Sequence, residues 1–152
     1  MKIRKAALKD LNLIVKINRD SQDPLDKIIG ITDQDMKNMC SNLLKYKKAE
    51  FYVYKNIALA CFKQDFVGYK NCELFLLLVS KKYQNKGIGT KLLKFIENHA
   101  KKRKFRAIYI YTHPIHTVAI RLYRKNGYKK INEFPNYYSN GDKSLLFGKK
   151  LK

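Results

Sequence analysis

A short stretch near the middle of the chain combines residue types that suit the binding of a phosphate group. Its residues are Gln84, Asn85, Lys86, Gly87, Ile88, Gly89 and Thr90. They follow an apolar run at residues 74–79, which predicts a buried strand, and they lead into a helical pattern. Glycines let the backbone approach a ligand closely, and the free N–H groups of a first helical turn attract anions. The stretch therefore predicts an anion site, although an ordinary strand–loop–helix connection has the same pattern.

The chain is strongly basic, with 33 Lys and Arg residues against 12 Asp and Glu residues and a formal net charge of +21. Such an excess attracts polyanions such as nucleic acids, anionic membranes or phosphorylated cofactors. The lysines are spread along the chain, however, and the densest cluster, residues 101–104, ends a predicted helix, where cations favour the helix dipole. A general lysine bias would give the same composition, so the charge supports a nucleic-acid partner only weakly.

Length and hydropathy indicate one globular domain that spans residues 1–152. A chain of this length can bury a substantial core, and its mean hydropathy is -0.46. No apolar segment is long enough to cross a bilayer, and the first residues lead into no signal-type apolar core, so we expect no membrane association. Because Cys40, Cys61 and Cys72 have no metal-binding spacing, we expect reduced thiols in a cytoplasmic protein without a bound metal.

The remaining pattern predicts strands and helices interspersed in a mixed α/β domain with several antiparallel hairpins. The expected strands cover residues 2–6, 51–54, 57–62, 74–79, 107–112, 128–133 and 143–149. Four helices are expected. The first covers residues 10–18, the second begins after a capping box formed by Thr32 and Asp35, the third runs from Thr90 onward, and the fourth runs from Val118 to Asn126-Gly127. Residues 19–30 are expected to form a loop or a broken helix. Lys55-Asn56 predicts a tight hairpin between the second and third strands.

Two separated motifs resemble those of the Gcn5-related N-acetyltransferase (GNAT) family. The sequence QNKGIG at residues 84–89 is similar to the family's Q/R-x-x-G-x-G/A signature. Residues 116–128, HTVAIRLYRKNGY, resemble its second motif, N-x-x-A-x-x-L-Y-x-x-x-G-F/Y, with His116 in place of the usual Asn. The motifs occur in the family's order, so the resemblance covers essentially the whole chain. It implies the acyl-CoA N-acyltransferase fold, a central mixed and mostly antiparallel sheet flanked by helices.

The resemblance implies that acetyl-coenzyme A (acetyl-CoA) binds along the central strand as a cosubstrate. Its pyrophosphate would lie against main-chain N–H groups of residues 84–90, and Lys86 would add charge. Leu78 and Val79 would contact the pantetheine arm, although both also suit plain core packing. His116 is assigned to the cofactor site by its motif position, and the change from Asn would alter any polar contact made there.

The implied reaction is direct attack of a primary amine on the thioester, with a base for the amine and an acid for the departing thiolate. Tyr123 falls on the family's tyrosine and is the candidate acid, since a phenol with a pKa near ~10 stays protonated at neutral pH. Glu73 has the spacing of the catalytic glutamate of histone-acetylating members and is the candidate base, with an ordered water as the alternative. Tyr111, His113 and His116 are further polar groups expected near the same cleft.

The sequence defines the acceptor amine less closely than it defines the cofactor. Residues 136–142, NYYSNGD, look like a loop of protein N-terminal acetyltransferases, including those that act on a ribosomal protein. Tyr137 and Tyr138, with Tyr111, are therefore candidate substrate-binding residues that would clamp a peptide N-terminus. Similar loops in other members close over polyamines or amino sugars, although the positive charge of the chain argues mildly against a cationic acceptor. Two alternatives remain: the chain is a non-catalytic domain that binds coenzyme A, or it is a small protein that binds RNA. We expect either a monomer or a homodimer.

Overall fold

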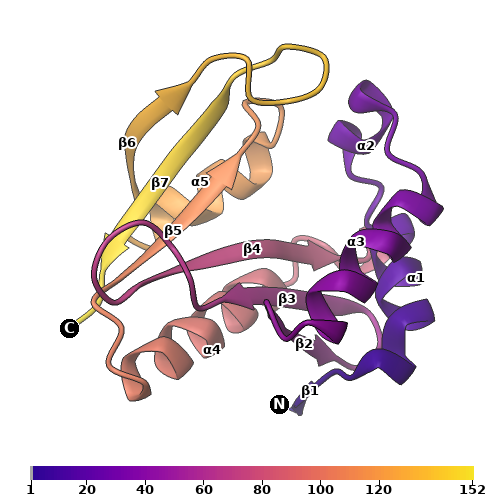
Figure 1. The fold of residues 1–152 in the computed structure, drawn as a ribbon, viewed down its shortest axis with the longest axis horizontal. Helices are drawn as coiled ribbons and strands as arrows, with labels where there is room; N and C mark the ends of the chain where they lie inside the picture. The colour runs from indigo at the N-terminus through magenta and orange to yellow at the C-terminus, as the bar shows by residue number, and fades with distance from the viewer. Residues whose placement is uncertain (1) are drawn as a thin grey trace.

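A single seven-stranded sheet forms the centre of the computed structural model, which describes residues 2–152 (Figure 1). Its strands are β1 (Ile3–Lys5), β2 (Glu50–Tyr54), β3 (Ala58–Lys63), β4 (Asn71–Val79), β5 (Ala107–Thr112), β6 (Lys129–Phe134) and β7 (Ser144–Lys150). They lie in the order β1-β2-β3-β4-β5-β7-β6, and every neighbouring pair is antiparallel except β4 with β5. The prediction of a mixed, mostly antiparallel sheet is confirmed.

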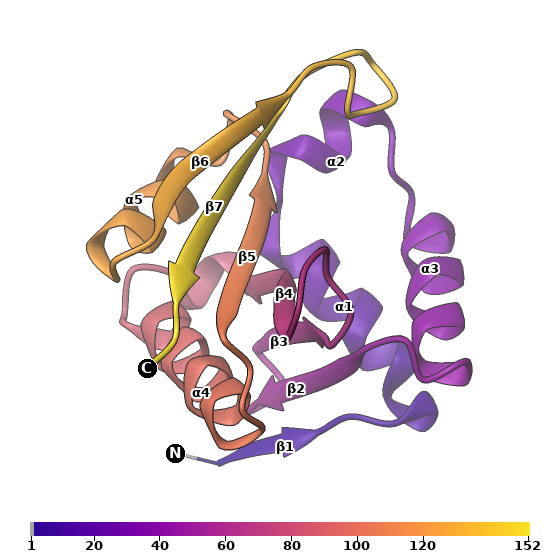
Figure 2. The same ribbon diagram turned by 60° about the vertical axis from the view of Figure 1, so that its left-hand side comes forward.

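Helices cover the two faces of the sheet unequally. They are α1 (Leu11–Ser21), α2 (Pro24–Ile29), α3 (Asp33–Lys45), α4 (Ile88–Lys102) and α5 (Thr117–Lys125), with short 3-10 turns η1 (Leu8–Asp10) and η2 (Lys81–Tyr83). The apolar sides of α1 and α3 pack on β2, β3 and β4, while those of α4 and α5 pack on the opposite face. In Figure 2 no described helix lies over the near face of β5, β7 and β6. Among residues 2–152, no helix has the length and apolarity needed to cross a membrane.

Local sequence signals predicted several of these elements well. The hairpin between β2 and β3 turns at Lys55 and Asn56, whose φ angles of 46° and 57° suit a tight two-residue turn. The capping box of α3 is present, because the Thr32 hydroxyl accepts a hydrogen bond from Asp35 N–H and the Asp35 carboxylate accepts one from Thr32 N–H. Both predictions are confirmed, and β5 covers the residues expected of it.

Residues 19–30 are more helical than a loop would be. Helix α1 continues to Ser21 rather than ending near residue 18, and α2 follows after a break of two residues. The Asp23 carboxylate caps α2 by accepting a hydrogen bond from Leu25 N–H at 2.9 Å, and Pro24 begins the helix. The broken-helix interpretation is therefore right and the loop interpretation is wrong. Elsewhere β4 begins three residues before, and α4 two residues before, the expected positions.

The pairing of β4 with β5 is short, and this shapes the centre of the sheet. Only residues 71–73 of β4 pair with residues 107–109 of β5, after which the two strands separate. On the other side of β4, Leu74 pairs with Phe62 and Leu76 with Cys61, so Phe75 is an extra residue in the ladder. Such a bulge bends its strand and increases the local twist. The sheet therefore opens between β4 and β5, and Figure 1 shows the two strands running in different directions.

Candidate active site

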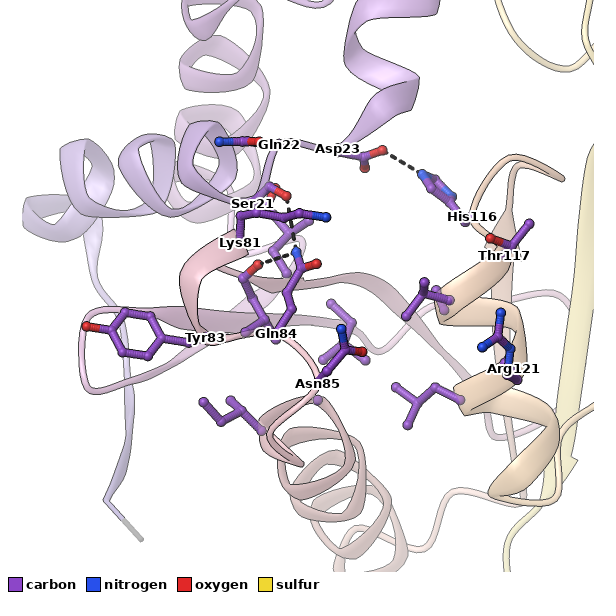
Figure 3. A pocket seen from close by; sticks show the side chains of 18 of the residues that line it. Ser21, Gln22, Asp23, Lys81, Tyr83, Gln84, Asn85, His116, Thr117 and Arg121 are labelled. Carbon is purple, nitrogen blue, oxygen red and sulfur yellow. Dashed lines mark hydrogen bonds and ion pairs between the residues drawn. The ribbon is translucent and has the colours of Figure 1, made fainter.

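A pocket of about 580 Å³ lies beside the end of β4, on the side where β4 has separated from β5 (Figure 3). Three further segments complete its walls: the turn at residues 84–90, the first turns of α5, and the corner between α1 and α2. The predicted phosphate-binding turn and the second motif therefore face the same space, although they are far apart in the sequence.

The side chain of Gln84 holds the turn in place. Its amide nitrogen donates hydrogen bonds to the Val79 carbonyl at 2.9 Å and to the Ser21 carbonyl at 3.2 Å. These bonds tie the start of the turn to the end of β4 and to the end of α1. Gln84 was predicted to bind the cofactor, and the geometry gives its side chain a bracing position on the pocket wall.

Six consecutive backbone amides, at residues 85–90, donate no hydrogen bond to any other described residue. Three of them belong to the first turn of α4, and Gly87 at its N-cap provides no side-chain cap. Gly87 has a φ of +81°, a left-handed conformation that favours glycine. Unpaired N–H groups at the positive end of a helix form an anion site, so this turn suits the phosphates of a nucleotide.

The second glycine of the turn allows two helices to meet. A Cβ atom placed on Gly89 would lie 3.3 Å from Cδ2 of Leu122, which belongs to α5. The N-terminus of α4 therefore approaches α5 closely, and both helices present their first turns to the pocket.

The cations that line the pocket differ from the one that was predicted. The ammonium group of Lys86 lies 5.7 Å from the centre of the Tyr83 ring, and Lys86 is not part of the pocket wall. Lys81, Arg121 and Lys125 line it instead. The sequence displays all of these charges equally, and only the direction of each side chain separates them.

Leu78 and Val79, which were expected to contact the cofactor, lie in the pocket wall together with Leu77. Leu78 is buried and packs among residues of the α1 and α3 side, while Val79 packs toward the α4 side. Beyond Glu73 the edge of β4 that faces β5 has no strand partner, so backbone groups along this edge are available to a ligand.

An ion pair crosses the pocket between Asp23 and His116. Nε2 of His116 lies 2.7 Å from Oδ1 of Asp23, and Nδ1 of His116 lies 3.0 Å from the hydroxyl of Thr112. Figure 3 shows the two residues on opposite sides of the pocket. Burial would raise the pKa of Asp23, but the hydrogen bond and charge of His116 and the Leu25 N–H outweigh it, so this pKa lies below its usual value. The sequence did not single out Asp23, and its signal was the Asp-Pro pair that starts α2.

The second histidine of this segment is held by a separate set of bonds. Nδ1 of His113 accepts a hydrogen bond from Ile115 N–H at 2.9 Å, so its Nε2–H must donate to Oδ2 of Asp142 at 2.8 Å. The ring of His113 is buried and lies 5.1 Å from the ring of Tyr138. His113 therefore anchors the loop at residues 136–142 to the end of β5.

Tyr123 is not among the residues that line the pocket. It is 5% exposed and packs against the rings of Tyr128 and Phe147. Its hydroxyl forms no hydrogen bond with any other described residue. Burial, together with the nearby charge of Asp23, raises the pKa of Tyr123, so the phenol is protonated at neutral pH.

Glu73 lies on the face of the sheet that carries α1 and α3, at the point where β4 and β5 separate. It is 7% exposed. Burial raises the pKa of its carboxyl. The ammonium group of Lys63, which pairs with Glu73 from the adjacent strand β3, opposes part of that rise. Its charge raises the pKa values of Tyr111 and Tyr137 after the larger effect of their own burial, which brings Tyr137 to about 12. Glu73 is therefore close to two of the predicted substrate-binding residues.

Aromatic rings form a continuous row on this side of the opening. Tyr111 stacks on Tyr137 with ring centres 5.2 Å apart, and Tyr137 meets Tyr138 edge-on at 5.0 Å. Phe66 extends the row, with its ring centre 5.8 Å from that of Tyr111. The structure thus brings together the three predicted tyrosines, while Phe66 went unnoticed because it lies in a loop without a recognisable motif.

The fold and this pocket define a class of protein that holds a phosphorylated ligand at a helix N-terminus beside a split sheet. The family model described as "Acetyltransferase (GNAT) family" matches residues 18–128. The chain belongs to this acetyltransferase family, and the resemblance seen in the two motifs is confirmed.

Comparison with individual proteins agrees with this assignment. "Probable N-acetyltransferase 14" of Xenopus tropicalis is 46% identical over 61 residues, which cover 40% of this chain and only 30% of that protein. The ribosomal-protein-S18-alanine N-acetyltransferase of Escherichia coli has a TM-score of 0.75 and 19% identity over 99% of this chain and 94% of that chain. PaiA N-acetyltransferase of Thermoplasma acidophilum, solved in complex with coenzyme A, has a TM-score of 0.71 and 20% identity over 99% of both chains. At such identities the two structures establish the fold alone.

We expect the replacement Gly87→Ala to weaken coenzyme A binding by about tenfold or more. Alanine is strained by roughly 1–2 kcal/mol at the left-handed φ of this position, so the turn would rearrange and its amides would lose their common direction. Titration calorimetry with coenzyme A measures the effect. Gly30→Ala is the control, since Gly30 has a φ of +71°, equally open surroundings and a place outside the pocket. Equal affinities of both variants and the parent would contradict the anion site.

Proposed function

We propose that this chain is an acetyl-CoA-dependent N-acetyltransferase that acetylates a primary amine by direct attack in a ternary complex. The observation that carries the proposal is the run of unengaged amides at residues 85–90 beside the opening between β4 and β5. The amides suit a diphosphate, and the opening leads from them to the face that carries Glu73 and the aromatic row. All three cysteines are free and buried, which agrees with a place in the cytoplasm.

Acetyl-CoA, when bound, would supply the thioester that an amine attacks. In this proposal residues 85–90 hold the diphosphate through main-chain N–H groups, and Gln84 braces their turn. Leu78 and Val79 line the path of the pantetheine arm, and the free edge of β4 offers it backbone partners. On the side of the pocket opposite β4, His116 holds the start of α5 to the start of α2 through its bond to Asp23. In this proposal His116 positions the wall and does not contact the ligand directly.

The reaction requires two proton movements, for which we propose Glu73 and Tyr123. The amine nitrogen forms a bond to the carbonyl carbon of the thioester while the carbon–sulfur bond breaks. Glu73 takes the proton that the amine loses, directly or through an ordered water. Tyr123 gives its phenolic proton to the departing thiolate, so coenzyme A leaves as a thiol. The raised pKa of Glu73 supports its role, because it makes the carboxylate a stronger base. The raised pKa of Tyr123 keeps the phenol protonated at neutral pH, so the proton is present when the thiolate departs, although it also makes the phenol a weaker acid.

We propose a protein N-terminus as the acceptor. The row formed by Phe66, Tyr111, Tyr137 and Tyr138 offers an aromatic surface along which the first residues of an extended peptide would lie. Glu73, beside the row, would accommodate the positive charge of the amino group before it is deprotonated. A small-molecule amine would use the same carboxylate but would gain little from the full length of the row.

The replacement Tyr123→Phe is expected to lower kcat by about 10²-fold, because the thiolate would lose its proton donor. The affinity for coenzyme A should remain nearly unchanged, since Tyr123 is not among the residues that line the pocket. Steady-state kinetics with thiol detection, together with calorimetry, separates the two effects. Tyr54→Phe removes a phenol from another tyrosine of the same core cluster and serves as the control. A Tyr123→Phe enzyme as fast as the parent would exclude this tyrosine as the acid.

The pH dependence of kcat/KM should contain an acidic limb caused by Glu73. Only the ionised carboxylate accepts a proton, so activity is lost as pH falls through its pKa, which burial places above the ordinary value of ~4.3. Glu73→Gln should remove this limb and lower kcat/KM by about 10²–10⁴-fold. Glu133→Gln, at an exposed ion-paired glutamate, is the control. If Glu73→Gln leaves the limb in place, another group is the base.

An acceptor screen that follows thiol release from acetyl-CoA tests the proposed acceptor. We expect peptides with a free N-terminus to be acetylated, and peptides with a blocked N-terminus, polyamines and amino sugars to be poor substrates. Tyr137→Ala should raise KM for the peptide by about tenfold, as loss of an aromatic anchor does at an interface, without changing coenzyme A affinity. Tyr46→Ala, at a tyrosine 63% exposed and outside the row, is the control. Faster turnover of a polyamine or amino sugar would replace the protein N-terminus with that class of acceptor.

A further inference from the structure

A second hollow, of about 670 Å³, lies at the opposite end of β5 from the candidate active site. We call it the basic groove, and it shares no residue with the pocket described above. The end of α4, the start of β5, the end of β7 and the loop before β4 form its walls. Its charged and exposed aromatic residues are Tyr69, Lys101, Lys104, Arg106, Lys150 and Lys152.

The charge of the basic groove is not balanced by the protein. Five cationic side chains line it, no carboxylate side chain does, and none of the five forms an ion pair with a described residue. Like charges gathered in one hollow repel each other, and a bound polyanion would relieve that repulsion.

The backbone around the groove is fixed by hydrogen bonds between separate elements. Arg106 N–H donates to the Lys70 carbonyl at 2.7 Å, and the Arg106 carbonyl accepts from Leu151 N–H at 2.9 Å. Phe105 N–H donates to the Ala100 carbonyl at 3.0 Å, which closes the end of α4. The cations therefore stand on a framework that holds their Cα positions, so the groove is already formed before a ligand binds.

Two tyrosines give the basic groove aromatic surface as well as charge. Tyr69 is 74% exposed, and the guanidinium of Arg106 lies 5.9 Å from its ring centre. Tyr109 of β5 packs over Gly148 of β7, where a Cβ atom would be only 2.8 Å from its ring, and it stacks on Phe66 with ring centres 4.7 Å apart. It is therefore a partly covered part of the wall, and Tyr69 is the exposed ring. An exposed ring beside cations is the combination that binds the bases and phosphates of single-stranded nucleic acids.

We propose that the basic groove binds a short segment of single-stranded nucleic acid, with its phosphates on the lysines and a base stacked on Tyr69. A membrane surface fits less well, because the cations line a hollow rather than a protruding face. A volume within the range of small-ligand sites admits a few nucleotides and not the width of a duplex. The groove shares no residue with the pocket, although its Tyr109 stacks on Phe66 of the aromatic row. The proposal is therefore tested at residues of the groove that lie outside that row.

The test measures binding of labelled single-stranded RNA and DNA of about 12 nucleotides by fluorescence anisotropy at several salt concentrations. The variant Lys101→Gln with Lys104→Gln and Arg106→Gln removes three charges from the groove. Its control, Lys9→Gln with Lys37→Gln and Lys48→Gln, removes three exposed charges from the opposite part of the chain. We expect the groove variant to weaken binding by about tenfold or more and to reduce the salt slope by about 2, which corresponds to ~0.7 for each lost phosphate contact. The control should change little.

A second pair of variants tests the stacking. Tyr69→Ala should weaken binding about fivefold or more, as loss of one stacked base does. Tyr46→Ala is a close control, because Tyr46 is also exposed and has a lysine ammonium 5.8 Å from its ring centre. Thermal unfolding and acetyl-transfer rates of all variants should match the parent, which separates this proposal from the proposed function.

Three outcomes would overturn the proposal. Equal losses in the two triple variants would mean that the total charge, and not the groove, attracts nucleic acid. Equal effects of Tyr69→Ala and Tyr46→Ala on binding would exclude the proposed stacking of a base on Tyr69. Tighter binding of duplex RNA, or of vesicles containing anionic lipid, than of single strands would assign the groove to a different partner. Comparing RNA with DNA then identifies which single strand is preferred.

Discussion

The structure depends on one incomplete interaction, the pairing of β4 with β5 over only three residues of each strand. Unpaired backbone groups inside a protein are costly, and most sheets avoid them by continuing the ladder. Here the bulge at Phe75 bends β4, while α1 and α3 pack on one side and α4 and α5 on the other. On the α4 and α5 face, one apolar cluster continues from β3 and β4 beneath the opening to β5 and β7. The opening between the two strands can persist because this shared core holds both halves of the sheet together.

Two sets of contacts keep this opening usable. Gln84 ties the amide-bearing turn to the ends of β4 and α1, so that the turn is held beside the pocket. Asp23 and His116 join α2 to α5 across the pocket, and Thr112 supports the ring of His116 from the end of β5. Every element around the pocket is therefore connected to another by a polar contact. Groups that lack partners are tolerated at this site because their neighbours are firmly held.

The extent to which the sequence predicts this arrangement follows from the range of each interaction. Local signals predicted the hairpin at Lys55-Asn56, the capping box at Thr32, and the glycine turn, because each involves only adjacent residues or the first helical turn. The bond between Asp23 and His116 joins positions 93 apart in the sequence, and no local pattern announces it. The position of Lys86 outside the pocket wall has a different origin, since a sequence shows which residues carry charge but not which way they point. The separation of β4 from β5 after residue 73 has no local signal in the sequence of either strand.

Local charge, rather than the net charge of +21, decides what the candidate site can accept. Lys81, Arg121 and Lys125 line the pocket near the amide-bearing turn, whereas Glu73 lies on the side with the aromatic row. Charges separated by more than ~8–10 Å through solvent are largely screened at physiological salt, so distant lysines contribute little to either region. The total charge had argued against a cationic acceptor, yet a buried carboxylate beside Tyr111 and Tyr137 would favour one. The two regions therefore differ in sign: the cations stand near the unengaged amides, and the carboxylate stands with the aromatic rings.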